Sequence, residues 1–239
     1  MKKSLVAIIF LTLCVEHAVC QIGERRNDLA IGFNAGYTIN SMMFDPSIEQ
    51  TMKGAPTFGF VVRYTCEKYF KSLCAIQAEF NYVNLGWEEK IETSTDTYSR
   101  DMYYIQIPVL ARMGWGYEHK GAMFYAIAGP QFSFLLSEKE HKGGAFSEET
   151  LSLRPGEVYE QYDVPADHKF EYGITGGVGL EVNTLKAGHF LLDARYYYGL
   201  SDIFSNGKKD PFGRSANGTI VIRFSFLFDI IHTPEDANN

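Results

Sequence analysis

Apolar and polar residues alternate along most of the chain with a period of two. The pattern is clearest in the two arms 169–183 and 189–200, where one row is aromatic and aliphatic and the other holds glycines and charged residues. Successive side chains of a strand point to opposite faces, so the period predicts strands, and the short connection between the arms predicts a hairpin. A soluble sandwich buries the apolar row, whereas a membrane barrel turns it to lipid and the polar row to its lumen.

Eight strands follow from the same alternation, with connections that are long and short in turn. The strands are expected near residues 29–40, 57–66, 76–82, 102–114, 122–137, 170–183, 189–200 and 217–228. The long connections are expected near residues 40–56, 87–101, 138–168 and 202–216. Outer-membrane barrels combine tight periplasmic turns with longer extracellular loops, so the sequence predicts an all-β, antiparallel, up-and-down transmembrane barrel. Pro108 and Pro130 lie inside two strands, where bulges are expected because proline donates no ladder hydrogen bond.

Composition narrows the class of protein further. Aromatic residues make up 15% of the chain, as expected for girdles at two membrane interfaces, although a large soluble β core also uses them. The formal net charge of -7 argues against nucleic acid as a main partner. After residue 20 no apolar run approaches the roughly 18 residues of a spanning helix, so a membrane role depends on strands.

The first 20 residues have the organisation of a cleaved secretory signal peptide. Two lysines precede an apolar run over 5–15, and Ala18-Val19-Cys20 offers small residues at the usual cleavage offsets, leaving Gln21 as the first mature residue. A lipoprotein signal ending at Cys20 fits less well, because the Leu and the adjacent small residue of such signals are missing. A periplasmic lead-in is then expected over 21–28, the barrel over 29–228 and a disordered tail over 229–239.

Cys66 and Cys74 stand at the two ends of a short turn. If the hairpin is symmetric about Phe70, they face each other, and a disulfide is geometrically conceivable in an oxidising compartment. Two free thiols are the equally acceptable alternative, and the turn offers too few ligands for zinc.

Four blocks carry a resemblance to a known family: IPVLARMGWG, FYAIAGPQFSFLLS, FEYGITGGVGLEV and FLLDARYYYGLSDI, followed by a final aromatic strand. Together they resemble the PorT-like outer-membrane β-barrel family of Bacteroidetes over essentially the whole mature chain. Ala-Gly-Pro-Gln at 128–131 and Asp-Ala-Arg-Tyr at 193–196 are the more specific parts. The resemblance implies an eight-stranded outer-membrane barrel and no particular chemistry. The founding member is associated with type IX protein secretion, and most members have no assigned activity.

The inward row contains four cations and four anions. They are Arg63, Glu79, Arg112, Glu171, Glu181, Asp193, Arg195 and Arg223. An eight-stranded barrel is only wide enough for its own side chains, and charges buried there must be paired. Balanced signs therefore predict a salt-bridged, closed lumen in preference to an ion path or a small-ligand site.

No catalytic, cofactor-binding or metal-binding residue is predicted. Glu171 and Glu181 are separated by ten residues of one strand, roughly 33 Å, which is too far for paired carboxylates. Nothing like a nucleophile elbow surrounds Ser147, so the set it would form with Asp167 and His141 or His168 is disfavoured. The long loop also carries six acidic residues, which we expect to be solvated surface and not a cation site. They are Glu148, Glu149, Glu157, Glu160, Asp163 and Asp167. Tyr159 and Tyr162 of the same loop are candidates for contact with a partner.

The predicted function is therefore non-enzymatic: an outer-membrane interaction or accessory module of the cell envelope, for which the resemblance to the PorT-like family implies a link to protein export. Its expected surroundings are outer-membrane lipid and envelope or secretion proteins that contact the extracellular loops. A narrow passive pore for small solutes and a soluble barrel of lipocalin type are the alternatives.

Overall fold

The computed structural model describes residues 23–91, 95–118, 120–144, 146–151, 160–184, 188–207 and 211–231. Its elements are β1 Glu24–Asp45, β2 Gln50–Thr51, β3 Lys53–Tyr69, β4 Ser72–Glu89, β5 Thr97–Gly116, β6 Gly121–Gly143, α2 Glu148–Leu151, β7 Phe170–Thr184, β8 Gly188–Gly199 and β9 Arg214–Ile231. The predicted signal peptide, including Cys20, and most of the predicted tail lie outside the described residues.

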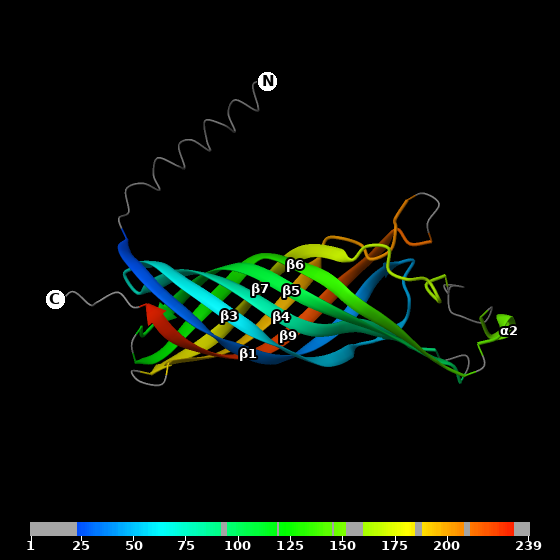
Figure 1. Ribbon diagram of the computed structural model, residues 1–239, viewed down its shortest axis with the longest axis horizontal. Helices are drawn as coiled ribbons and strands as arrows, with labels where there is room; N and C mark the ends of the chain where they lie inside the picture. Colours follow the sequence, from blue (N-terminus) through cyan, green and yellow to red (C-terminus); the bar gives the residue numbers. More distant parts are fainter. Residues whose placement is uncertain are drawn as a thin grey trace, which may run out of the picture.

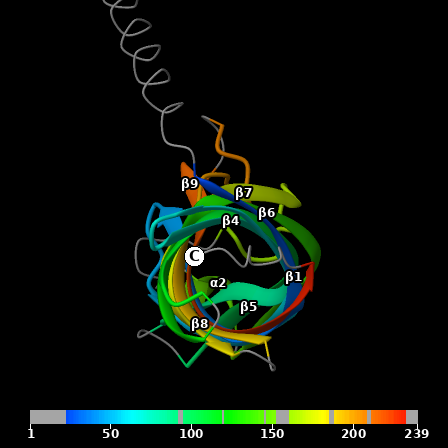
Figure 2. The same ribbon diagram turned by 90° about the vertical axis from the view of Figure 1, so that its left-hand side faces the viewer.

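The long strands form a closed antiparallel barrel (Figures 1 and 2). Each long strand pairs with the next long strand in the chain, β4 with β5 included. Strand β1 closes the ring against β9 in a register that runs from Leu29 to Asp45. Among the described residues there are eight long strands, and the two-residue β2 is an addition that pairs only with β4. The predicted all-β antiparallel barrel is confirmed. Closure leaves no long strand with a free edge, which removes a site of unwanted pairing.

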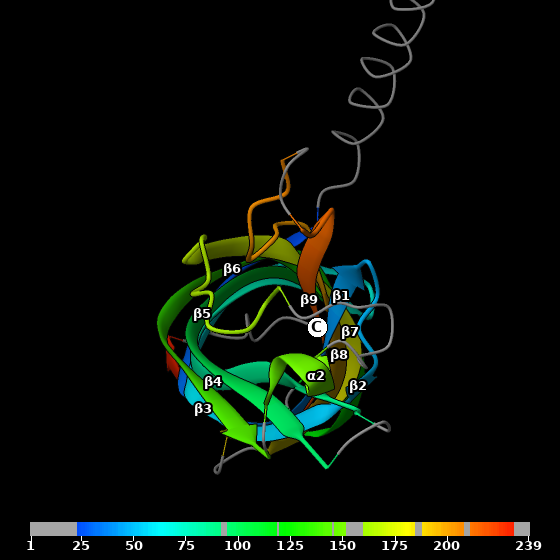
Figure 3. The same ribbon diagram turned by 90° about the vertical axis from the view of Figure 1, so that its right-hand side faces the viewer.

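The two ends of the barrel differ. The end that holds Glu24 and Ile231 carries the connections 70–71, 117–120 and 185–187, and is called the turn end below. The opposite end carries the connections 46–52, 90–96, 144–169 and 200–213, and is called the loop end (Figure 3). The long and short connections therefore sort to opposite ends, as the sequence predicts.

The apolar rows face outwards over the middle of the barrel. Phe33, Ile174 and Phe224 are 57%, 54% and 50% exposed, whereas Glu79 and Arg195 are buried inside. This is the orientation that a bilayer stabilises, since lipid takes the place of a core around the outer surface. A soluble lipocalin-type barrel has the reverse arrangement. No helix among the described residues is long and apolar enough to cross a membrane.

The strands are longer than predicted at the loop end. The expected loops 40–56 and 87–101 consist in large part of β1, β3, β4 and β5, and β6 continues to Gly143. The polarity of the rows inverts there: Leu85, Trp87 and Met102 point inwards and are fully buried. Beyond the bilayer the outer face meets water, so the apolar residues move to the inside and the membrane pattern no longer marks the strand.

Three further expectations about the strands are wrong. Pro108 pairs with Gln131 and Pro130 with Ile174 without a bulge at either proline. One missing N–H removes a single ladder bond, and pairing on both sides keeps the register. At the termini, β1 begins at Glu24, inside the predicted lead-in, where Glu24 pairs with Lys68. Strand β9 continues to Ile231, past the predicted start of the tail.

Candidate functional site in the barrel lumen

All eight charged residues predicted for the lumen lie inside the barrel, each at most 5% exposed. They come from β3, β4, β5, β7, β8 and β9, because inward positions recur at every second residue of each strand. The structure gathers seven of them into two clusters, one in the middle of the lumen and one near the turn end, and leaves Glu171 apart.

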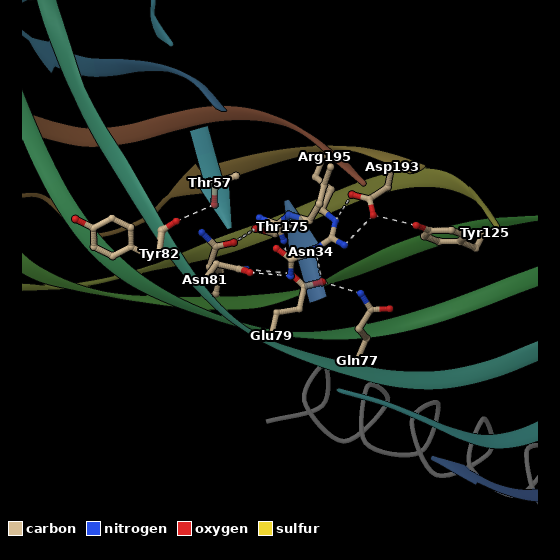
Figure 4. A network of polar contacts seen from close by, with 12 residues as sticks. Asn34, Thr57, Gln77, Glu79, Asn81, Tyr82, Tyr125, Thr175, Asp193 and Arg195 are labelled. Atoms are coloured by element: carbon tan, nitrogen blue, oxygen red, sulfur yellow. Dashed lines mark hydrogen bonds and ion pairs between the residues drawn. The ribbon is translucent and has the colours of Figure 1, made fainter. Parts of the chain in front are cut away.

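Glu79 is the centre of the first cluster (Figure 4). Its carboxylate accepts a hydrogen bond from Arg195 Nη1 at 2.8 Å and another from Gln77 Nε2 at 2.6 Å. Arg223 and Asn81 complete its shell. A carboxylate with two guanidinium partners and two amide donors is compensated for its loss of water.

Asp193 extends this cluster across the lumen. It accepts from Arg195 Nε at 2.6 Å and Nη2 at 3.0 Å, and the hydroxyl of Tyr125 donates to it at 2.9 Å. Two carboxylates and two guanidinium groups from β4, β8 and β9 therefore neutralise one another within hydrogen-bond distance. The result is a neutral, cross-linked layer inside the barrel.

Glu181 organises the second cluster, near the turn end. Arg63 Nη1 lies 2.8 Å from both of its oxygens, and Arg112 binds the same carboxylate. His189, a residue that the sequence reasoning missed, places Nδ1 2.9 Å from Glu181 and Nε2 2.9 Å from Asp229. The signal for His189 was present, because it continues the inward row of β8 two residues before Leu191.

A cavity of about 230 Å³ lies beside this cluster. Its wall includes Arg63, Arg112, Glu181 and His189, together with Glu118 near the turn end. The wall of the cavity mixes both signs of charge, and its Arg63, Arg112 and His189 all bind Glu181. It therefore forms the mouth of the lumen at the turn end.

Glu171 departs from the predicted pairing. Among the described residues it has no ion pair; the hydroxyl of Tyr104 and the Nδ2 group of Asn217, 2.8 Å away, donate to it. Four cations and four anions do not form four pairs, because Glu79 and Glu181 each take two arginines. Which arginine binds which carboxylate depends on the residues that face each other across the barrel. The alternation of residues along a single strand does not predict these contacts.

The loop half of the lumen is filled by an apolar cluster that was not predicted. Its buried members are Met42, Phe44, Val83, Leu85, Trp87, Tyr98, Met102, Tyr104, Leu135, Ala166, Ile203, Phe204 and Phe212. Residues of the connections 144–169 and 200–213 thus pack into the mouth of the barrel. We call this set the loop-end core.

Arg100 ties the loop-end core to the long connection. Its guanidinium lies 2.9 Å from Glu138, donates to the backbone oxygen of Val164 at 2.6 Å, and stacks 5.5 Å from the rings of Trp87 and Phe204. Glu89 also holds the long connection. Its carboxylate accepts hydrogen bonds from the side chains of Gln161 at 2.7 Å and Tyr162 at 2.5 Å. Residues 161–166 are therefore fixed on the barrel. Sequence reasoning did not find Glu89 and Arg100 as contacts of this segment, because it assigned residues 87–101 to a loop.

The residues considered for catalysis do not assemble. Ser147 is bonded to Thr150, His168 lies 3.2 Å from the backbone oxygen of Asp202, and His141 lies 3.0 Å from Asp101. Asp167 accepts from the backbone N–H of Ser205 at 2.8 Å, which lowers the pKa of its carboxyl group.

The acidic loop residues that the structure describes show no metal-binding arrangement. Asp163 is paired with Lys142 at 2.5 Å, and Glu149 is exposed. Within the part of the chain that the structure describes, no group of three His, Cys, Asp or Glu residues is arranged to hold a metal ion. Glu157, Tyr159 and the side chain of Glu148 lie outside the described residues.

Cys66 and Cys74 are free thiols. The assumption of a hairpin symmetric about Phe70 is wrong: Cys74 pairs with Glu67, and a bulge between Thr65 and Glu67 leaves Cys66 without an opposite residue. The thiol of Cys66 donates to the backbone oxygen of Cys74 at 3.2 Å. The two side chains are thus displaced by the bulge from the facing positions that the symmetric register would give.

Comparison with solved structures finds a likeness of fold to OprG, and a weaker likeness to Ail. The OprG outer membrane protein of Pseudomonas aeruginosa is 13% identical, with a TM-score of 0.50 over 86% of this chain and 98% of that one. Ail of Yersinia pestis, described as the attachment invasion locus protein, is 13% identical over 86% of this chain and 99% of that one, with a TM-score of 0.36. No curated protein matches the chain.

A family match decides the class of protein. The family described as outer membrane protein beta-barrel domain matches residues 20–205, which include every long strand except β9. Its description agrees with the closed barrel and with the outward apolar rows. The chain therefore belongs to the outer membrane protein beta-barrel domain family, and the outer membrane is its location.

Proposed function

We propose that the protein is a non-enzymatic barrel with a closed lumen, which serves the cell envelope as an interaction or accessory module through its loop end. The observation that carries this proposal is the filling of the lumen. Glu79 with Arg195 and Arg223 forms a neutral layer in its middle, and the loop-end core occupies the next part. A lumen filled in this way leaves the outer surface and the two ends for function.

The loop end has the properties of a preformed contact surface. Arg100 and Glu89 hold residues 161–164 against the barrel through hydrogen bonds, so a partner that binds there meets ordered chain. Binding to ordered loops costs less conformational entropy than binding to loops that must first become ordered. The resemblance to PorT-like proteins makes export-related envelope proteins the partners we propose, reached after removal of the signal peptide at residues 1–20.

Replacing residues 146–160 by a short Gly-Ser linker tests the loop-centred role. This change keeps β6, and it keeps the anchored residues 161–166. Crosslinking with mass spectrometry in the native envelope should then show loss of the partner contacts, while the barrel still folds. A matched control replaces the short connection 185–187 at the turn end with a linker of equal length. An unchanged set of crosslinked partners in the first variant would count against the proposal.

A further inference from the structure

Cys66 and Cys74 lie close to each other at the turn end, but they are out of register. The thiol of Cys66 is 3.2 Å from the backbone oxygen of Cys74, and both side chains are only partly buried. Short connections mark the periplasmic end of outer-membrane barrels, and the periplasm is an oxidising compartment. Both thiols are therefore accessible to thiol–disulfide exchange at this end.

A one-residue bulge keeps the two cysteines from facing each other. Up to the bulge the register of β3 with β4 is continuous, and it ends with Thr65 opposite Ala75. Beyond the bulge Glu67 is opposite Cys74. If the continuous register ran on by one residue, Cys66 would be opposite Cys74. Opposed residues of antiparallel strands have Cα atoms roughly 4.5–5.5 Å apart, within the range of about 4.4–6.8 Å that a disulfide spans.

The bulged register involves few residues. Beyond the bulge β3 pairs with β4 through residues 67–69, and with β1 through Glu24 and Arg25. The register of β1 with β3 is itself irregular between Arg25 and Asp28. A shift confined to this tip therefore leaves the register of the rest of the barrel unchanged.

The turn at the tip does not hold the hairpin in the bulged register. It consists of Phe70 and Lys71, and Phe70 has a φ of 52°, which is uncommon for a bulky residue. In the continuous register Lys68 is opposite Ser72, and the turn lengthens to the three residues 69–71. A three-residue hairpin turn has its positive φ at the last position, so Phe70 leaves that conformation.

The register also decides which charge faces the mouth of the lumen. In the bulged register Lys68 is opposite the buried Leu73, so its side chain faces inwards, and its Nζ lies 2.7 Å from Glu118. In the continuous register Glu67 is opposite Leu73 and takes the inward position. Lys68 turns to the outer face, because successive side chains of a strand alternate. The ion pair with Glu118 is then replaced by the approach of two carboxylates.

We propose that Cys66 and Cys74 form a disulfide in the periplasm, and that this bond shifts the hairpin tip into the continuous register and removes Lys68 from Glu118. The connection 117–120 then loses this bond to β3, so the thiol state of the chain sets the contacts at the turn-end mouth. These residues lie at the opposite end from the loops, so the inference does not depend on the loop-end role.

The bond forms in two exchange steps with an external disulfide, either of a protein or of a small molecule. The thiolate of one cysteine attacks the external disulfide, which gives a mixed disulfide and releases the first external sulfur as a thiol. The thiolate of the second cysteine attacks the mixed disulfide and releases the other external sulfur. The two cysteine thiols are oxidised, the external disulfide is reduced to two thiols, and the two protons pass to these thiols.

Disulfide mapping in native envelopes tests the covalent bond. After acid quenching and alkylation of free thiols, trypsin places Cys66 in the peptide 64–68 and Cys74 in the peptide 72–90. The two peptides should be recovered joined, and reduction should separate them. Recovery of both cysteines as alkylated thiols, in envelopes and after treatment of the purified barrel with glutathione disulfide, would overturn the proposal. Disulfide-linked dimers of the chain on a non-reducing gel would also contradict it.

Carbodiimide coupling of the purified barrel in detergent micelles tests the register. The reagent joins a lysine amine to a touching carboxylate, so Lys68 should couple to Glu118 in the reduced protein, and this link should be lost after oxidation. Lys53 and Asp101 of the loop end, also 2.7 Å apart, are the matched control and should couple in both states. Persistence of the Lys68–Glu118 link in the disulfide form refutes the change of register.

The Cys66→Ser variant separates the disulfide from other effects of the oxidant. It keeps a small side chain at the bulge and cannot form the bond, so its Lys68–Glu118 link should survive glutathione disulfide. Loss of the link in this variant would show that the disulfide is not the cause, and the proposal would fail. The partner crosslinks of the loop end are a separate measurement, so they can fail without affecting this result.

Discussion

Glu79 and Glu171 are carboxylates buried in the same lumen but held in different ways. Glu79 has two arginine partners, Arg195 and Arg223, whereas Glu171 is bonded to the neutral groups of Tyr104 and Asn217. Removing one partner of a buried ion pair leaves the other charge uncompensated in a medium of low dielectric constant. Glu171 has no cationic partner among the described residues, so its removal leaves no buried charge uncompensated.

Glu79→Gln should therefore destabilise the barrel by about 3–5 kcal/mol, because it removes the carboxylate that compensates the buried positive charges of Arg195 and Arg223. Glu171→Gln is the matched substitution, and its effect should stay within about 1 kcal/mol, since a side-chain amide can still accept a hydrogen bond. Guanidinium unfolding of the refolded protein in micelles, followed by tryptophan fluorescence, measures both. Equal losses of stability would contradict this assignment of the two carboxylates.

At the scale of the strands, alternation along the chain predicts which residues face inwards but not which of them meet. The rows of β7 and β8 were read correctly from the sequence, because lipid on one side and a packed lumen on the other enforce a period of two. The extensions of β4 and β5 were missed, since Trp87, Tyr98 and Met102 point inwards where the outer face is in water. The partners of Glu171 depend on closure of the ring, which no local pattern records.

The closing seam between β1 and β9 depends on a glycine. A Cβ at Gly32 would lie 1.8 Å from the backbone oxygen of Phe226, so a side chain there forces the two strands apart. A Cβ at Gly176, in β7, meets nothing closer than the backbone oxygen of Ile127 at 4.0 Å. The two glycines are therefore needed to different degrees, although both lie inside strands of the same barrel.

We expect Gly32→Ala to impair closure and to lower the unfolding midpoint, with a loss of stability of about 1–3 kcal/mol from overpacking. Gly176→Ala is the control and should refold like the unmodified protein. The heat-dependent shift of folded barrels in gel electrophoresis, together with guanidinium unfolding, reports both effects. Normal folding of Gly32→Ala would show that the seam can widen to accept a methyl group.

For the whole molecule, the contents of the lumen distinguish a closed barrel from a narrow pore. Ions that cross must pass the neutral layer of Glu79, Asp193, Arg195 and Arg223, and then the loop-end core. An eight-stranded barrel has little room beside its own side chains. Both obstacles lie in series, so opening one of them leaves the other in place.

We therefore expect the purified, refolded protein to give no discrete conductance steps in planar lipid bilayers, with an open porin as the positive control for insertion. Glu79→Gln, which loosens only the ionic layer, should also remain silent, because the loop-end core still fills the lumen. Conductance steps in independent preparations that change in size with Glu79→Gln would place the ion path through the ionic layer. That outcome would favour the narrow pore over the closed interaction module.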